Sequence, residues 1–397
     1  MNNYNELHTP LEADFQFLLP SAIKSLPHSI EYGSRWDTYG SSSGWSYDTT
    51  QPAFGEYLER KHFYLDVPTH AREPLDETLT AEELAEFQYA FAQTGREAAS
   101  PWKNNLPLEL TRVIRIKDYS ACKIPTACIK LSACTSAHDN EIYPLRDTCG
   151  CSAHTSIDKA IFGAIKEALE RQYLLRFWLT GSYCEPVETL LLLGALKNSP
   201  TSTLFKCLMQ SGEITALNLT DRNFPGTCIL LCYGNPMAHT AVRYCAGMAY
   251  AENLENALEK SVIELWQTFR FMHSFSAAGK DLTQIKDPYL QHFLNANSYQ
   301  TYLTITTITP HTVTESNSQE FTLENLIQLL RERELYGYLY PNQLLTDKTT
   351  IYFCKYLSPN IFLHMNNSKN FNTSNLYSRH FLSEIRPDRL ATMVPFP

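Results

Sequence analysis

The chain has 397 residues, 44% hydrophobic and 12% aromatic, which is enough for a large folded core and excludes disorder for most of its length. The net charge of -9 argues against a nucleic-acid backbone as the main partner. Eleven cysteines, no secretory signal and no apolar run of membrane-spanning length indicate a soluble cytoplasmic protein whose thiols are reduced.

The first part of the chain predicts an arm, a glycine-rich segment and two helices. Residues 1–30 contain several prolines and are expected to form an irregular N-terminal arm. Residues 32–45 are rich in Gly, Ser, Tyr and Trp, which suits a loop or twisted strand end whose backbone approaches a ligand closely. Helices are expected over 53–63 and 81–93, the second opened by a capping box between Thr80 and Glu83.

Two strands are expected next, between residues 110 and 132. In the first, Ile114 and Ile116 alternate with basic residues, and the second is the apolar cluster of Cys128, Ile129 and Leu131. Because no CxxC pair occurs, the cysteines are interpreted as buried thiols and not as a metal site.

The rest of the chain alternates between helical and strand patterns. The longest periodic segment, 156–180, has apolar residues at steps of three and four, which predicts an amphipathic helix with one buried face. Because strands and helices interleave, the fold class is α/β or α+β. Strands are expected near 216–219, 227–233 and 350–356, helices over 254–273 and 323–334, and a loop or edge region over 300–317.

Three of the predicted helices carry polar groups at matching spacing. Residues 56–60 read EYLER and residues 167–171 read EALER, so the pattern ExLER occurs twice. Positions i, i+3 and i+4 share a helix face, and each copy therefore presents two carboxylates and one guanidinium together. The helix over 254–273 offers Glu264 and Gln267 at the same step, with Ser261 about one turn earlier.

A single ExLER copy is most simply a solvated Glu–Arg salt bridge, which contributes about 0.3–0.5 kcal/mol. Two copies, each followed by bulky apolar residues, favour interior helices in which carboxylates need a cation to offset desolvation. Several glutamates with two arginines suit a site for Mg²⁺ and polyphosphate, since Mg²⁺ prefers oxygen ligands and arginine forks suit phosphate. No Walker-type or kinase-type glycine loop is present, so the common ATP-binding folds are not expected.

These residues resemble the YcaO family over about residues 30–397. The resemblance rests on the GEYLER run at 55–60, on DTCGCS at 147–152 leading into EALER, and on Gly247 leading into ELWQ at 264–267. The runs FLHMNNS at 362–368 and MVPFP at 393–397 are similar to the YcaO cyclodehydratase (D) subunits of microcin B-type azole-forming synthetases.

The resemblance implies the YcaO fold, with mixed sheets and interior helices that carry an ATP and Mg²⁺ site. It divides the chain into an arm over 1–30 and a YcaO domain over 31–397, whose tail over 376–397 reaches the active site. It also implies an ATP-dependent cyclodehydratase that converts Cys, Ser or Thr of a ribosomal precursor peptide to thiazoline or oxazoline by phosphorylating the backbone amide oxygen. Phosphoryl transfer needs mainly positioning and charge stabilisation, which an acid-rich Mg²⁺ site supplies.

The resemblance assigns roles residue by residue. The carboxylate of Pro397 is the expected proton acceptor, although a frayed terminus is the ordinary state of a chain end. The cofactor contacts it implies are Arg60, Arg171, Ser261 and Gln267, and the Mg²⁺ ligands are Glu56, Glu59, Glu167, Glu170 and Glu264.

Three features depart from the family pattern. The early glycine loop lacks the lysine that the family often has, which leaves one phosphate contact unassigned. Phe269 stands where an arginine often follows the glutamine, with Arg270 one step off, and the proline-rich tail is reduced to Pro395 and Pro397. None of these departures removes an expected metal ligand.

Partners follow from the same resemblance. We expect a hetero-oligomer with the precursor peptide, a leader-binding ubiquitin-activating-like zinc subunit and an FMN-dependent dehydrogenase that oxidises azolines to azoles, without nucleic acid or membrane. Two alternatives stay open: another YcaO-type backbone modification that forms an amidine or thioamide, and a non-catalytic docking or scaffold subunit of the synthetase.

Overall fold

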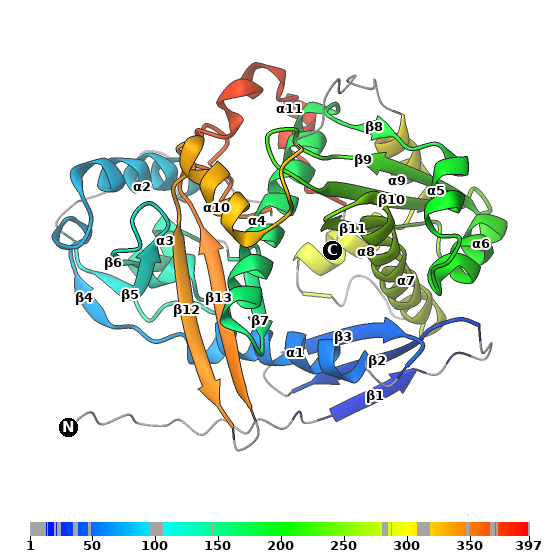
Figure 1. Ribbon diagram of the computed structural model, residues 1–397, viewed down its shortest axis with the longest axis horizontal. Helices are drawn as coiled ribbons and strands as arrows, with labels where there is room; N and C mark the ends of the chain where they lie inside the picture. The colour runs from blue at the N-terminus through cyan, green and yellow to red at the C-terminus, as the bar shows by residue number, and fades with distance from the viewer. Residues whose placement is uncertain are drawn as a thin grey trace.

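Three β-sheets surround a long central helix in the computed structural model (Figure 1). The structure describes residues 13, 15–19, 21, 25–34, 39–46, 49–95, 106–144, 146–279, 285–286, 288–307, 318–346, 349–365, 370 and 372–395. Within these residues, three sheets whose strand pairs are all antiparallel and the interleaved helices confirm the predicted α/β (α+β) class.

The first sheet has three antiparallel strands in the order β1-β2-β3, covered by helix α1. The strands are β1 (Phe15–Leu19), β2 (His28–Gly33) and β3 (Tyr39–Gly44). Part of the predicted irregular arm is therefore strand, because β1 pairs with β2 along its whole length. Helix α1 (Thr50–Lys61) confirms the predicted first helix and continues as a π-helical turn (His62–Asp66).

The second and largest sheet has the order β4-β5-β12-β13-β7, with β6 paired to β5. Its longest hairpin joins β12 and β13, which project downward together in Figure 1. The predicted strand at 350–356 is β13. The bounds are β4 (Ala71–Glu73), β5 (Leu108–Arg115), β6 (Ala121–Pro125), β7 (Cys151–His154), β12 (Tyr338–Leu345) and β13 (Thr350–Leu357).

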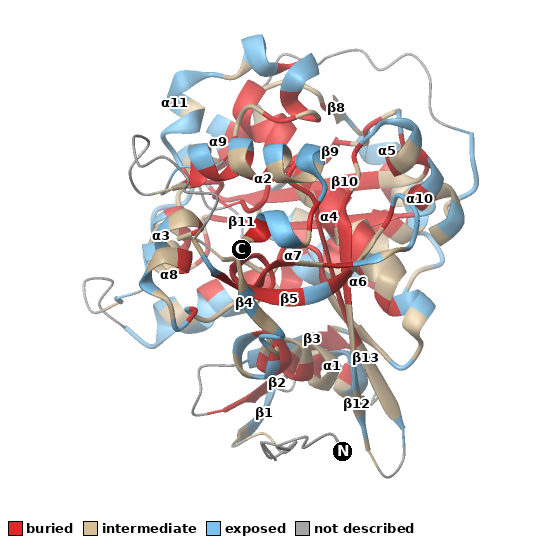
Figure 2. Cartoon of the chain, turned by 90° about the vertical axis from the view of Figure 1, so that its left-hand side faces the viewer, coloured by how far each residue is buried: buried red, intermediate tan, exposed pale blue. Residues whose placement is uncertain are grey.

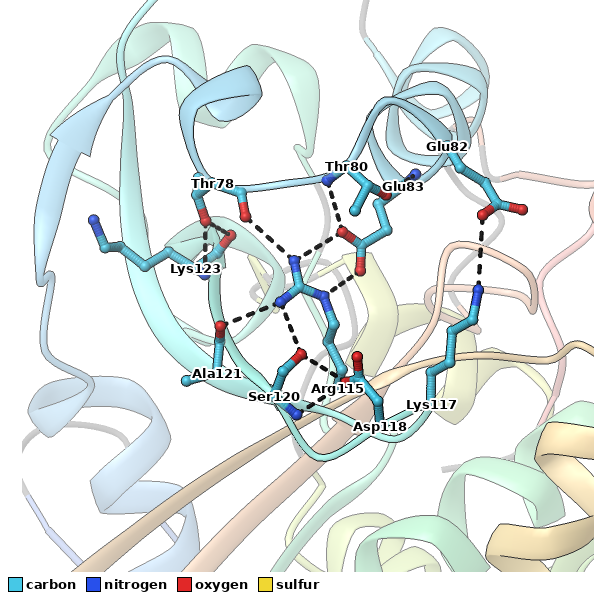
Figure 3. Close-up of polar contacts among 10 residues, drawn as sticks. All are labelled: Thr78, Thr80, Glu82, Glu83, Arg115, Lys117, Asp118, Ser120, Ala121 and Lys123. Atoms are coloured by element: carbon cyan, nitrogen blue, oxygen red, sulfur yellow. Dashed lines mark hydrogen bonds and ion pairs between the residues drawn. The ribbon is translucent and has the colours of Figure 1, made fainter.

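Helix α2 (Ala81–Thr94) begins with the predicted capping box, in which Thr80 and Glu83 exchange hydrogen bonds. Two guanidinium nitrogen atoms of Arg115 in β5 also donate to the Glu83 carboxylate, at 2.5 and 2.9 Å (Figure 3). This fork ties the start of the helix to the sheet.

One strand prediction in this region is wrong. The cluster of Cys128, Ile129 and Leu131 is not a strand; the second strand is β6, and a 3-10 turn (Thr126–Cys128) follows it. Burial explains the error, since Cys128 and Ile129 are core residues of a turn. Short helical elements complete the region: 3-10 turn Leu75–Glu77 and helix α3 (Ala137–Ile142).

The third sheet has the order β11-β10-β9-β8 and carries helix α7 on one face. The Thr-rich segment predicted as loop or edge is helix α9 over its first seven residues, and 308–317 lie outside the described residues. The elements are β8 (Glu185–Pro186), β9 (Glu213–Asn218), β10 (Thr227–Gly234), β11 (Tyr244–Ala251), α5 (Thr189–Ala195), α6 (Thr201–Ser211), α7 (Leu254–Ala277), α8 (Pro288–Asn295) and α9 (Tyr299–Thr306).

Helix α4 (Ile157–Thr180) runs through the middle of the molecule and is buried on all sides in its second half (Figures 1 and 2). Every residue from 172 to 180 is buried. A helix that is apolar all round belongs in a core, so the prediction of a single buried face holds only for its first turns. Around its C-terminal end lie α10 (Leu323–Glu332), two 3-10 turns (Ser378–His380 and Leu382–Glu384) and α11 (Pro387–Leu390).

All eleven cysteines are free thiols, and ten of them are buried. This agrees with their interpretation as structural residues. Among the described residues, no helix is long and apolar enough to cross a membrane.

Candidate active site

The three helices that carry the spaced acids, α1, α4 and α7, pack on different strands and lie around the central part of the molecule (Figure 1). Helix α1 lies on β3 and also touches β7, whereas α4 packs on β7 and β13. Helix α7 lies on β11 and β10 and reaches β3. The predicted convergence of the three motifs therefore has a physical basis in sheet packing.

Two strand glycines allow the backbones of α1 and α7 to lie in close contact with their sheets. A Cβ added to Gly40 of β3 would lie 2.1 Å from the Tyr57 amide nitrogen and 2.3 Å from the Ala53 carbonyl oxygen. At Gly247 of β11, a Cβ would lie 2.1 Å from the Leu265 nitrogen and 2.4 Å from the oxygen of Ser261. In both helices, the residue pressed against the glycine directly follows a predicted metal ligand. The same close contact thus presents Glu56 and Glu264 in matching positions.

Small residues bring α4 equally close to the second sheet. Gly150, with φ of +70°, lies where a Cβ would be 2.3 Å from the Tyr356 carbonyl oxygen and 3.4 Å from the Ala168 Cβ. A Cβ on Gly163 of α4 would lie 2.4 Å from the Ser152 hydroxyl. The glycine in the CGC run is therefore needed both for its left-handed backbone and for the approach of α4.

Main-chain donors and arginines orient the carboxylates. The Ser41 amide donates to Glu56 at 2.9 Å, so the backbone of the Gly/Ser-rich segment does reach the site. Arg60 donates to Glu56 at 3.4 Å and lies 3.5 Å from Glu59. In helix α4 a main-chain amide binds the second glutamate of the motif instead of the first: the amide of Tyr250 donates to Glu170 at 2.7 Å.

Arg171 completes the second motif, with its guanidinium 3.7 Å from Glu167. Each arginine is therefore paired within its own helix turn, as the i, i+4 spacing predicts. The Arg171–Glu167 pair is mostly enclosed, with side chains 19% and 21% exposed, whereas the Glu56 side chain of the first motif is 37% exposed. The solvated salt-bridge interpretation does not fit the burial of the second pair.

Three of the carboxylates lie in surroundings that oppose their charge. Burial raises the pKa of Glu59 to about 8; Arg60 lowers it, and the charges of Glu167 and Glu56 raise it. Burial also raises the pKa of Glu167 to about 7, against the lowering effect of Arg171. The pKa of Glu264 rises to about 8, again first from burial and then from the charge of Glu170. Acids on different helices thus act on each other, which requires them to be close.

A small cavity of about 30 Å³ lies between α4, α7 and the third sheet, beside Arg171 and Glu264. Glu264 faces it, which makes this carboxylate accessible although protein surrounds it. Gly247 and Thr268 also line the cavity.

The donor set fits a divalent cation by charge and chemistry. Carboxylate oxygens are the ligands that Mg²⁺ prefers, and a bound cation would offset the burial that raises the pKa of three of these acids. Within the described part of the chain, no three His, Cys, Asp or Glu side chains are already arranged as a metal cluster. The acids predicted as ligands all lie on the three helices α1, α4 and α7: Glu56, Glu59, Glu167, Glu170 and Glu264.

Two of the predicted cofactor contacts need separate comment. Ser261 is fully buried, and its hydroxyl donates to the main-chain oxygens of Ile229 and Ala257, so in this structure it joins α7 to β10. Gln267 lies one turn after Glu264 and is partly buried. Pro397, the predicted proton acceptor, lies outside the described residues.

The displaced arginine of the third helix has another partner. The Arg270 guanidinium lies 5.7 Å from the centre of the Trp266 ring, and its charge lowers the pKa of Glu31 in β2. Phe269, which stands in the family's arginine position, packs in the apolar cluster beneath α7. The third helix therefore contributes no arginine to the acid cluster.

Three groups beside the site were missed by sequence reasoning as functional residues. Burial raises the pKa of Tyr289 in α8, and the charges of Arg171, Asp147 and Arg60 also affect it. The charge of Lys166 in α4 lowers the pKa of both Glu167 and Glu264. The charge of Lys355 in β13 lowers the pKa of Glu59. None belongs to a recognisable spacing pattern, so only the tertiary structure identifies them.

Comparison with known proteins gives matches over the whole chain. Residues 50–361 match the family described as YcaO cyclodehydratase, ATP- and Mg²⁺-binding. The microcin B17-processing protein McbD of Escherichia coli is 30% identical, over 100% of this chain and 100% of that protein.

Solved structures are similar as well. A chain of the E. coli microcin synthetase McbBCD complex with pro-MccB17 bound matches with a TM-score of 0.87 and 28% identity, over 98% of this chain and 99% of that one. YcaO from Methanopyrus kandleri, bound with AMPPCP and Mg²⁺, matches with a TM-score of 0.58 and 14% identity over 91% and 90%. The second likeness is one of fold alone.

Proposed function

The chain belongs to the YcaO cyclodehydratase family, and we propose that it forms thiazolines and oxazolines in a ribosomal precursor peptide at the expense of ATP. The observation that carries the proposal is that acids on three helices act on one another's charge and that three of these carboxylates have a pKa raised to about 7 or 8. Bound Mg²⁺ would stabilise the ionised carboxylates and would in turn hold the nucleotide phosphates.

The reaction balances as a dehydration driven by ATP. The thiol or hydroxyl of a Cys, Ser or Thr in the peptide attacks the carbonyl carbon of the preceding residue, and a new C–S or C–O bond forms. The amide oxygen then takes the γ-phosphoryl group of ATP, and ADP is released. Phosphate leaves with that oxygen as the amide nitrogen loses its proton and the C=N bond forms. An amide oxygen leaves poorly, whereas phosphate leaves well.

The residues of the chain have distinct tasks in this scheme. Bound Mg²⁺ would neutralise phosphate charge, held by Glu56, Glu59, Glu167, Glu170 and Glu264. Arg60 and Arg171 either brace these carboxylates, as they do in the structure, or turn toward phosphate. Gln267 and Ser261 are the remaining cofactor positions implied by the family. For Ser261 the support is indirect, because its hydroxyl bonds the backbone of β10 and α7.

Pro397 is proposed to accept the proton through its terminal carboxylate. The support comes from the residues just before it. The Trp178 indole donates to the Thr392 oxygen at 3.0 Å, and His292 of α8 lies 3.0 Å from the Met393 oxygen. Val394 is 3% exposed and belongs to the core around α4. A tail held this firmly is unlike a frayed end, and its anchor α8 also carries Tyr289 beside the site.

The partners are proposed from the same relatives. The related E. coli chain belongs to a McbBCD complex that binds pro-MccB17, so this chain is expected to work in a hetero-oligomer with its own precursor peptide. The leader-binding zinc subunit and the FMN-dependent dehydrogenase remain the expected companions. We place the complex in the cytoplasm, where substrate cysteines stay reduced.

Mass spectrometry of the precursor peptide after incubation with the assembled complex, ATP and Mg²⁺ tests the proposal. The expected result is loss of one water for each modified residue, with one phosphate released for each. Exchange of an amide oxygen for sulfur would indicate a thioamide instead, and loss of water with every Cys, Ser and Thr side chain left unchanged would indicate an amidine. If the assembled complex neither consumes ATP nor changes the peptide, the chain is a docking or scaffold subunit.

A further inference from the structure

Lys355 is a buried cation that the proposed reaction does not yet use. It lies on β13, between β12 and β7, and pairs with Cys151 of β7 in the sheet register. Only 5% of the residue is exposed. Lysine is almost never this deeply buried unless it is paired, because an ammonium group loses its hydration.

The hydrogen bonding of Lys355 does not neutralise it. Its ammonium donates to the main-chain oxygen of Asp147 at 3.0 Å, and among the described residues no carboxylate forms an ion pair with it. Its charge instead acts on the carboxyl of Glu59 and on the thiols of Cys151 and Cys128. Of these three groups only Glu59 is a carboxylic acid, and because burial raises its pKa to about 8, it is mostly uncharged at neutral pH and offsets the ammonium only in part.

The same lysine holds the turn that separates the second sheet from α4. Asp147, whose backbone oxygen it binds, uses its carboxylate to accept from the amides of Cys149 and Met365, at 3.0 and 2.6 Å. Gly150 follows in the same turn, wedged between Tyr356 and Ala168. Lys355 therefore fastens the turn on which α4 rests while its charge acts on an acid of α1.

We propose that Lys355 is a positioning residue of the nucleotide site: it fixes the 147–151 turn against α4, and its positive charge on β13 favours the net-negative Mg²⁺–nucleotide complex. It touches neither nucleotide nor peptide. The inference rests on the proposed function, since it requires that α1, α4 and α7 bind Mg²⁺ and nucleotide. It also supplies a lysine near a site whose glycine-rich segment has none.

A fixed charge on β13 has a signature that a purely structural residue lacks. A positive charge attracts the Mg²⁺–nucleotide complex, which is anionic, and repels free Mg²⁺. Removal of the charge should therefore weaken the first interaction and strengthen, or leave unchanged, the second. Loss of structure would weaken both together.

The test compares Lys355→Gln and Lys355→Arg in the full chain. Glutamine keeps a donor for the Asp147 oxygen without the charge, whereas arginine keeps both. Calorimetry would measure the Kd of AMPPCP in excess Mg²⁺ and the Kd of Mg²⁺ alone, with the melting temperature of each variant. We expect Lys355→Gln to raise the AMPPCP Kd about tenfold, not to raise the Mg²⁺ Kd, and Lys355→Arg to stay within a few-fold of wild type.

Two results would overturn the inference. One is a Lys355→Gln variant that binds AMPPCP as tightly as wild type. The other is a parallel loss of both affinities, with a lower melting temperature, in Lys355→Gln and Lys355→Arg alike. If wild-type protein does not bind Mg²⁺–AMPPCP at all, the proposed function itself fails, and the inference with it. That outcome is visible before any variant is made.

Discussion

Replacement of Glu167 by glutamine should stabilise the free protein and inactivate the enzyme at the same time. Glu167 pairs with Arg171, has 21% of its side chain exposed, and acts through its charge on Glu59 of α1. Burial raises its pKa from 4.5 to about 7, which disfavours the charged form in the folded state. Glutamine has nearly the same shape and carries no charge.

The magnitude follows from the pKa shift. A rise from 4.5 to about 7 corresponds to about 3 kcal/mol of stability that wild type has below pH 4.5 and loses as the pH rises through 7. Arg171 loses its partner in the variant, which offsets part of this gain, so the net stabilisation at pH 8 is about 1–2 kcal/mol. For a chain of this length, that corresponds to a rise of about 1–2 °C in Tm.

The assay is thermal unfolding of wild type and Glu167→Gln from pH 5 to pH 8, with ATP turnover measured in the assembled complex. The difference in Tm should be near zero at pH 5 and grow toward pH 8, while turnover is lost. Glu141→Gln, an exposed carboxylate on α3, is the control and should change neither. A variant that is destabilised at pH 8, or a difference that ignores pH, would refute the electrostatic reasoning. Unchanged turnover would refute the role in the site.

Three further predictions concern packing, proton linkage and the tail. Gly247→Ala should cost about 1–3 kcal/mol of unfolding free energy and weaken nucleotide binding, because its Cβ would collide with the backbone of α7, whereas Gly55→Ala, with no atom within 4 Å, should not destabilise. Binding of Mg²⁺–AMPPCP at pH 7 should release roughly two protons, measured by calorimetry in buffers of different ionisation enthalpy, and a buffer-independent heat would contradict the raised pKa values of the acids. Trp178→Phe removes the hydrogen bond to the Thr392 oxygen and should slow turnover several-fold without changing the Kd for AMPPCP; equal losses in both would indicate a general packing defect.

Helices with clear periodicity and caps were predicted well from the sequence. The helices that became α1, α2, α4, α7 and α10 all lie within a few residues of their expected bounds, because local patterning decides them. The strand β11, which reads YCAGMAYA, was missed: all eight residues are buried, so it has no alternation to detect. The helix α9 was missed because threonine-rich segments favour strands or loops locally, and its burial against the third sheet overrides that tendency.

The candidate site divides in the same way. The ExLER spacing predicts which side chains share a helix face, and the pairs of Arg60 and Arg171 with their glutamates confirm it. What spacing cannot predict is the contribution of backbone and distant strands. The amides of Ser41 and Tyr250 reach the acids, and the ammonium of Lys355 reaches the backbone of Asp147, only because three sheets fold around α4.

The most direct test of the account follows the amide oxygen itself. A precursor peptide would carry oxygen-18 in the carbonyl that precedes a reactive cysteine, and the assembled complex would process it with ATP and Mg²⁺ in ordinary water. If the chain phosphorylates the backbone amide, the label leaves with phosphate, one labelled phosphate for each ring. Label that appears in water, with unlabelled phosphate, would contradict the central claim even if rings form.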